Sequence, residues 1–135
     1  MTTIDATPHL ARAGLESVPA GFPSPAQDYY GGPIDLNRHL IANPISTFIV
    51  RVSGDSMVRA GIHDGDEIVV DRSLEARDGS VVVAVLDGEL TVKRLRISGG
   101  RTWLAPENPD YPVIEMHEAS DLSVWGVVTY CLHHV

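Results

Sequence analysis

The stretch SVVVAVLDGELTVKRLRI, residues 80–97, decides the fold that we predict for this chain. Two runs rich in Val, Leu and Ile flank Asp87 and Gly88, and both of these residues tolerate the positive φ angles that a type I′ turn requires. β-Branched residues favour strands, because their side chains pack well on a pleated surface. The stretch therefore predicts a β-hairpin with strands at 80–86 and 89–97.

Other short runs after residue 47 have the same character, and each is bounded by Gly, Pro, Asp or Ser. They cover residues 47–52, 67–71, 102–105, 113–116 and 123–133. Because few helical segments separate these strands, they predict an antiparallel, mainly β fold, either a sandwich or a partly closed barrel.

One short helix is predicted between Asp35 and Ile41. Asp35 is a suitable N-cap, since its carboxylate can accept hydrogen bonds from the first free backbone N–H groups. Leu36, Leu40 and Ile41 fall on one helical face. Pro44 prevents the helix from continuing.

Residues 1–33 are predicted to form an extended N-terminal arm, followed by a β-rich domain at 34–135. The arm holds five of the nine prolines, and proline at this density prevents helices and central strands. It also carries apolar residues, so we expect it to pack loosely on a surface or to swap between chains.

The composition excludes several classes of function. A chain of 135 residues is long enough for one domain with its own core. Its net charge of -8 argues against binding by neutralisation of nucleic-acid phosphates. No apolar run reaches the ~20 residues that span a bilayer, and the N-terminus has no signal-peptide pattern. We therefore expect a cytoplasmic protein with no membrane contact and no direct, specific nucleic-acid binding.

The remaining polar candidates have simpler interpretations. Lys93, Arg94, Arg96 and Arg101 form a basic cluster, which a charge-paired strand face explains better than a nucleic-acid site. Trp103 and Trp125 are expected in the core, because both lie in apolar strand runs.

Neither the single cysteine nor the histidines predict a cofactor site. Cys131 cannot form an internal disulfide, which fits a reducing compartment, and we expect it to be a buried small apolar residue. The pair His133-His134 is too short to predict a metal site. We find no metal-ligand cluster and no glycine-rich phosphate loop, so no cofactor is expected.

Ser56 follows a strand that stops abruptly at Ser53-Gly54-Asp55. Such residues form turns, so Ser56 has an ordinary structural interpretation in a strand-ending turn followed by a short helical turn. It could also be a nucleophile, provided that a neighbouring base takes its proton. None of the six histidines has a recognisable spacing to Ser56.

Lys93 is the other candidate base. A lysine acts as a base only when it is neutral, and burial favours the neutral form. Period-two alternation places Lys93 on one strand face with Thr91, Leu95 and Ile97, a face that is at least half apolar. It could equally lie at a sheet edge with its ammonium group in water. Nine of the ten basic residues are arginine, which cannot serve as a base.

A turn after a strand also leaves backbone N–H groups free. Such groups can stabilise the oxyanion of an acyl-transfer reaction. In this chain the backbone N–H groups of Asp55 and Ser56 are the expected donors.

Three blocks together resemble the LexA/UmuD family of self-cleaving Ser-Lys peptidases. They are VSGDSM at 52–57, GIHDGDEIVVD at 61–71 and DGELTVKRL at 87–95. Two further blocks, AGFPSPAQDY at 20–29 and IDLNRHLI at 34–41, resemble the UmuD-type branch in particular.

The resemblance implies a mainly β, LexA/signal-peptidase-like catalytic domain in a homodimer that cuts its own N-terminal arm once. By position it implies Ser56 as nucleophile, Lys93 as general base and Ala20-Gly21 as the scissile pair. UmuD-type proteins often have cysteine before the glycine, whereas this chain has alanine, as LexA repressors do. Both residues are small, so cleavage is still expected.

The resemblance also implies a place in the SOS response to DNA damage. Cleavage would be stimulated by the RecA–single-stranded-DNA filament. The processed dimer would serve as a subunit of an error-prone translesion polymerase, with a UmuC-type Y-family DNA polymerase as its partner.

One other function stays open at this point, and the sequence argues against two more. The same domain could be a non-catalytic dimeric docking module for a polymerase, with an inert serine and lysine. A signal-peptidase-like protease shares the Ser-Lys chemistry but needs a membrane anchor and an export signal, and we find neither in this sequence. A LexA-like repressor needs a DNA-binding domain, for which the arm is too short.

Overall fold

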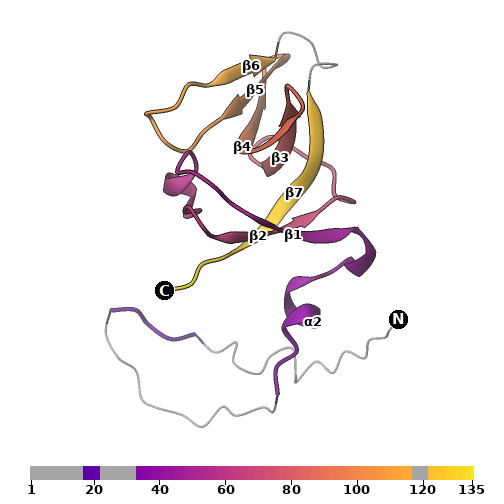
Figure 1. Cartoon of the computed structure of the whole chain (residues 1–135), viewed down its shortest axis with the longest axis vertical. Helices are drawn as coiled ribbons and strands as arrows, with labels where there is room; N and C mark the ends of the chain where they lie inside the picture. The colour runs from indigo at the N-terminus through magenta and orange to yellow at the C-terminus, as the bar shows by residue number, and fades with distance from the viewer. Residues whose placement is uncertain (1–16, 22–32, 117–121) are drawn as a thin grey trace. The chain divides into compact units, whose positions relative to one another are not determined.

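The computed structural model describes residues 17–21, 33–116 and 122–135 of the chain (Figure 1). The chain divides into two units, Met1–Ala42 and Asn43–Val135. Most of the predicted arm, at 1–16 and 22–32, lies outside the described residues. The described part at 17–21 has no regular secondary structure and is exposed.

The first unit contains the helix α2 (Leu36–Leu40). The Asp35 side chain accepts hydrogen bonds from the backbone N–H groups of Asn37 and Arg38, which confirms the predicted N-cap. The C-cap Ile41 has an extended backbone, so the helix ends before Pro44, as predicted. Within the described part of the chain, no helix is long and apolar enough to cross a membrane.

The second unit is one antiparallel sheet with the strand order β1-β2-β7-β3-β4-β5-β6. The strands are β1 (Thr47–Arg51), β2 (Glu67–Asp71), β3 (Val81–Leu86), β4 (Glu89–Ser98), β5 (Arg101–Ala105), β6 (Ile114–Met116) and β7 (Ser123–Leu132). Two 3₁₀ turns accompany them, η1 (Pro44–Ser46) and η2 (Val58–Ala60). The predicted antiparallel, mainly β fold is thus confirmed.

The predicted hairpin is present as β3 and β4. Leu86 pairs with Glu89 across the turn. Asp87 and Gly88 adopt φ angles of 50° and 79°, as a type I′ turn requires. The turn fixes the register of β4 and therefore the sheet face that carries Lys93.

The long strand β7 connects the two halves of the sheet. Its C-terminal half pairs with β2 and its N-terminal half with β3, and Figure 1 shows it as a curved ribbon between them. Irregularities in register at Val69/Val70 and Val83/Ala84 accompany these pairings. Bulges of this kind increase local twist and bend a sheet.

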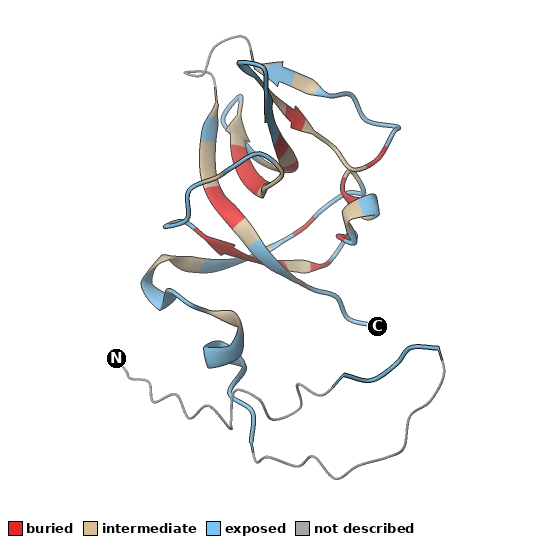
Figure 2. Cartoon of the chain, turned by 180° about the vertical axis from the view of Figure 1, so that it is seen from behind, coloured by how far each residue is buried: buried red, intermediate tan, exposed pale blue. Residues whose placement is uncertain are grey.

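Two apolar clusters form the core of this unit. Figure 2 colours all buried residues red, and the buried members of both clusters are among them. One contains Met57 and Ile62 from the segment after β1, together with residues of β2 and β3. The other gathers residues of β3, β4, β5 and β7, including Leu95 and Leu104. Met57 is almost fully buried, so it anchors the turn that carries Ser56.

Candidate active site

The turn that carries Ser56 is hydrogen-bonded to the segment that precedes β2. The backbone N–H of Val52 donates to the Asp66 carbonyl, and that of Gly65 donates to the Val52 carbonyl, each at 2.8 Å. The backbone N–H of Gly54 donates to Asp64 Oδ1 at 2.8 Å. Gly54 has a φ of 94°, which a residue with a side chain adopts only under strain. The chain therefore reverses sharply just before Ser56.

The loop after β5 holds the same turn from its other side. The backbone N–H of Glu107 donates to the Ser56 carbonyl at 2.8 Å. Asn108 Nδ2 donates to the Asp55 carbonyl at 2.9 Å, and the Tyr111 hydroxyl donates to Asp55 Oδ1. The hydrogen bond to Asp55 raises the pKa of Tyr111 and keeps its hydroxyl protonated as a donor. Ser56 is thus held in one position by two segments, residues 64–66 and 107–111, that are distant from each other in sequence.

The fold brings Lys93 and Ser56 together. Lys93 lies on β4 and is only 8% exposed, while Ser56 is half-buried. The distance from Lys93 Nζ to Ser56 Oγ is 3.1 Å. Lys93 Nζ also donates to Thr91 Oγ1 at 2.9 Å and to the Val92 carbonyl at 3.1 Å. The sequence alternative of a lysine with its head in water does not describe this side chain.

Burial lowers the pKa of Lys93 from its ordinary value. Within the described ranges, no carboxylate lies within ion-pair distance of its amino group. An opposite charge would favour the ammonium form, and here none offsets the effect of burial. The surroundings therefore favour a neutral amine, which is the form that can accept a proton.

The expected oxyanion donors have no competing partner in the part of the chain that the structure describes. No hydrogen bond there uses the backbone N–H of Asp55 or of Ser56. Their carbonyl groups, by contrast, accept hydrogen bonds from the loop after β5. The turn therefore has its carbonyls fixed and two N–H groups available for an incoming oxygen.

A shallow hollow of about 350 Å³ adjoins this turn on the side of the loop after β5. Its walls come from Arg59, the segment 106–109, Tyr111 and Val113, and do not include Ser56 or Lys93. Glu107 and Asn108 therefore both line the hollow and form hydrogen bonds to the turn that carries Ser56.

Ala20 and Gly21, the expected scissile pair, lie in the first unit, and both are exposed. Exposure of a segment without regular structure is what cleavage by a peptidase needs, because an extended backbone can enter an active site.

The basic cluster around Lys93 is charge-paired. Its three arginines each contact one carboxylate, in the pairs Arg94–Glu107, Arg96–Asp78 and Arg101–Glu115. Paired guanidinium groups are less available to nucleic-acid phosphates, which agrees with the interpretation from sequence.

The core predictions for the tryptophans and the cysteine hold in part. Trp103, Trp125 and Cys131 are intermediate in exposure, and Trp125 and Cys131 pack against the first core cluster. Burial raises the pKa of the Cys131 thiol to about 11, and its hydrogen bond to Asp66 acts in the same direction. The thiol is therefore protonated and unreactive at neutral pH.

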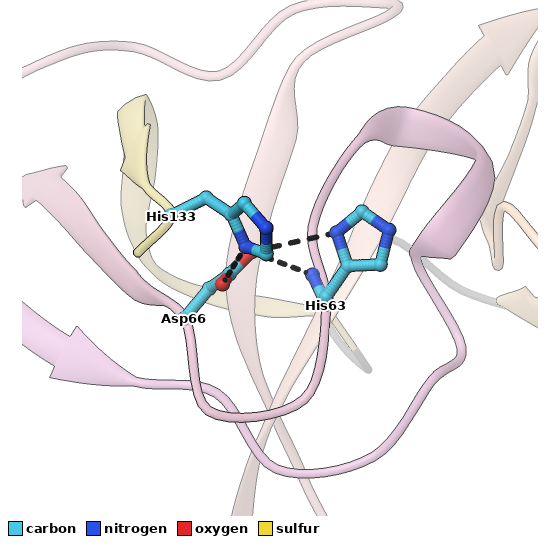
Figure 3. A group of neighbouring side chains, drawn as sticks. All are labelled: His63, Asp66 and His133. Carbon is cyan, nitrogen blue, oxygen red and sulfur yellow. Dashed lines mark hydrogen bonds and ion pairs between the residues drawn. The ribbon is translucent and has the colours of Figure 1, made fainter. Parts of the chain in front are cut away.

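Sequence reasoning missed two groups of residues. One is the pair Asn108 and Tyr111, which supports Asp55. The other is the group His63, Asp66 and His133 (Figure 3). Asn108 and Tyr111 lie more than fifty positions from Asp55, and His133 lies 67 positions from Asp66, although His63 is only three positions from Asp66. Local spacing could indicate only the His63–Asp66 pair, and not the distant partners of either group.

Comparison with known proteins identifies related chains over most of this sequence. The family model described as Peptidase S24-like matches residues 13–129. Protein SamA of Salmonella typhimurium is 48% identical over 118 residues, which cover 87% of this chain and 81% of SamA. Protein MucA of Escherichia coli is 46% identical over 119 residues, covering 87% of this chain and 81% of MucA.

A LexA repressor, from Dechloromonas aromatica, is also similar. It is 46% identical over 114 residues, which make up 84% of this chain but 56% of the repressor. The resemblance seen in the motifs thus extends through nearly the whole chain and reaches both branches of the family. The chain belongs to the Peptidase S24-like family, as a UmuD-type member related to LexA.

Proposed function

We propose that this chain is a serine peptidase of the SOS response that cuts its own arm between Ala20 and Gly21, with Ser56 as nucleophile and Lys93 as general base. Membership of the family supports the self-cleaving activity. The observation that carries the proposal is the 3.1 Å distance between Ser56 Oγ and the Nζ of a buried, unpaired lysine, in the part of the chain that the structure describes.

The reaction begins with a proton transfer. Neutral Lys93 has two N–H groups, which Thr91 Oγ1 and the Val92 carbonyl can accept. Its lone pair is then left for the Ser56 hydroxyl. Lys93 takes the hydroxyl proton as Ser56 Oγ attacks the carbonyl carbon of Ala20.

The carbonyl oxygen of Ala20 becomes an oxyanion as the Oγ–C bond forms. The backbone N–H groups of Asp55 and Ser56 are free of described partners and donate to it. The hydrogen bonds from Asn108 and Tyr111 to Asp55 hold this pair of donors in place before the substrate arrives.

The intermediate collapses when the Ala20–Gly21 bond breaks. The Lys93 ammonium gives its proton to the leaving amine of Gly21, and Ala20 stays attached to Ser56 as an ester. A water molecule, deprotonated by Lys93, hydrolyses the ester and restores the Ser56 hydroxyl. The product is residues 21–135.

The substrate is a segment of the same protein, from the same chain or a partner subunit, so its effective concentration is high and cleavage must be restrained. The restraint is an arm held away from Ser56, or a Lys93 that stays charged. We infer that the RecA–single-stranded-DNA filament stimulates cleavage by binding the cleavable state better.

The processed protein then acts in the cytoplasm as a homodimer. We infer that it serves as a subunit of an error-prone translesion polymerase, with a UmuC-type Y-family DNA polymerase as partner. The UmuD-type relatives support this role in SOS mutagenesis.

The test is a time course of intact mass for the purified full chain at about pH 7 and about pH 10, values that lie below and near the ordinary pKa of lysine. We expect the mass of residues 21–135 to appear faster at the higher pH, because more Lys93 is neutral there. A rate that stays flat between the two pH values would rule out the lysine base.

Two variants separate the proposed roles. Ser56→Ala removes the nucleophile, and Lys93→Arg keeps a cation that cannot act as a base. Neither variant should release the fragment at either pH, even with the RecA filament added. If the unmodified chain with the filament also gave no fragment, the chain would be a docking module with an inert serine and lysine.

A further inference from the structure

Two histidines and a buried aspartate meet on the surface of the second unit (Figure 3). His63 and Asp66 come from the segment before β2, and His133 follows β7. One ligand atom from each residue can be chosen so that all three lie within 4.8 Å of one another. His133 Nδ1 is 2.6 Å from Asp66 Oδ1, and His63 Nδ1 is 3.6 Å from Asp66 Oδ2.

Asp66 supplies a fixed negative charge at this place. Its side chain is only 4% exposed. The backbone N–H of His63 donates to its carboxylate at 2.8 Å, which fixes the position of the side chain. Among the described residues, neither Lys nor Arg pairs with it.

The two imidazoles are half-exposed, whereas the carboxylate is buried. The His63 and His133 side chains are 51% and 48% exposed, so each ring has solvent on one side and Asp66 on the other. Tetrahedral zinc ligands at ordinary bond lengths lie about 3.3 Å apart. The three donors already lie within 4.8 Å of one another, and we expect rotation of the two exposed rings to bring them to that spacing around a shared ion.

The donor set selects the class of ion. Two imidazole nitrogens and one carboxylate oxygen suit Zn²⁺, whereas Mg²⁺ prefers oxygen ligands alone. Cys131 Sγ lies 3.4 Å from Asp66 Oδ2 but is not one of the three grouped donors. Water would complete the coordination on the exposed side of the two rings.

We propose that His63, Asp66 and His133 form a binding site for a divalent transition-metal ion of the Zn²⁺ class. The ion would join the C-terminal end of β7 to the segment before β2. That same segment holds the turn of Ser56 through Asp64 and the Asp66 carbonyl. The site is separate from the Ser56–Lys93 pair, and its existence does not rest on the proposed peptidase activity.

The test is a calorimetric titration of ZnCl₂ into the full chain, free of any affinity tag and carrying Ser56→Ala so that it stays intact. We expect one Zn²⁺ per chain. Loss of a residue that only supports a metal ligand typically weakens metal binding about tenfold or more. His63→Asn and His133→Asn each remove a ligand itself, so each should weaken Zn²⁺ binding by at least about tenfold. Asparagine keeps an N–H that can donate to Asp66, so both variants are expected to fold.

His134→Asn is the matched control, because it removes the neighbouring histidine, which is not part of the group. It should bind Zn²⁺ like the unmodified chain, and MgCl₂ should give no saturable signal. The proposal is overturned if the unmodified chain shows no saturable Zn²⁺ binding. It is also overturned if His133→Asn, shown to be folded by circular dichroism, binds as tightly as His134→Asn.

Discussion

Lys93 is surrounded so that both of its protonation states can be accommodated. The three oxygen atoms near Nζ belong to Ser56, Thr91 and Val92. A charged ammonium can donate to all three, whereas a neutral amine donates to two and faces Ser56 with its lone pair. Because the hydrogen bonds satisfy either state, burial is the factor that favours the neutral form. Burial of the Lys93 amino group should therefore cost stability at neutral pH, where a lysine in water is charged.

Replacing Lys93 should make the protein more stable. We expect Lys93→Met to raise the free energy of unfolding at about pH 7 by about 0.5–2 kcal/mol, the range common for single stabilising substitutions. The pKa of Lys93 is lower in the folded state, so the unfolded chain binds more protons and stability rises with pH up to about 10.5. The gain in the variant should therefore shrink as the pH rises.

Urea unfolding of both chains at about pH 7 and about pH 9.5 measures this effect, with the second value just below the ordinary pKa of lysine. Both chains carry Ser56→Ala to prevent cleavage. A loss of stability in Lys93→Met at the lower pH would mean that the hydrogen bonds of Lys93 outweigh its burial.

At the scale of elements, the strands were predictable because their signals are local. The predicted strand 67–71 has the same bounds as β2, and the predicted strand 47–52 differs from β1 by one residue. Alternation and turn chemistry act over a few neighbouring residues, so a sequence displays them directly. Which strands pair is a long-range property, and the two bonds that Asn108 and Tyr111 make to Asp55 could not be predicted for that reason.

Gly126 shows how closely β7 packs against β2. A Cβ atom at this position would lie 2.5 Å from Val70 Cγ1 and 3.3 Å from Arg72 Cγ. Gly126→Ala should therefore destabilise the fold by about 1–3 kcal/mol, as overpacking does in cores. Urea unfolding in the Ser56→Ala background measures the change.

Val70→Ala supplies the matched test, because it removes the methyl group that the new Cβ would meet. We expect the double variant to be more stable than the sum of the two single effects predicts, by about 0.5 kcal/mol or more. Simple additivity would show that Gly126 is needed for a reason other than this contact.

At the scale of the whole molecule, the β1–β2–β7 section carries exposed apolar side chains. Ile49 pairs with Val69, which in turn pairs with Tyr130, so these three residues share one face. Leu132 lies two positions further along β7 and therefore on the same face. Ile49, Tyr130 and Leu132 are 56%, 45% and 37% exposed. Apolar residues grouped in this way are typical of an interface between subunits.

We predict that the proposed homodimer uses this face. Ile49→Asp or Tyr130→Asp would place a charge in a desolvated interface, and either change should weaken dimerisation by about tenfold or more. Leu90→Asp is the control, since Leu90 is 52% exposed but lies on β4, which is not a neighbour of β1 or β2. Sedimentation equilibrium of the three variants in the Ser56→Ala background measures the dissociation constants. If Leu90→Asp weakens the dimer as much as Tyr130→Asp does, the subunits do not meet through this face in particular, because a specific interface should distinguish the 45% exposed Tyr130 from the 52% exposed Leu90.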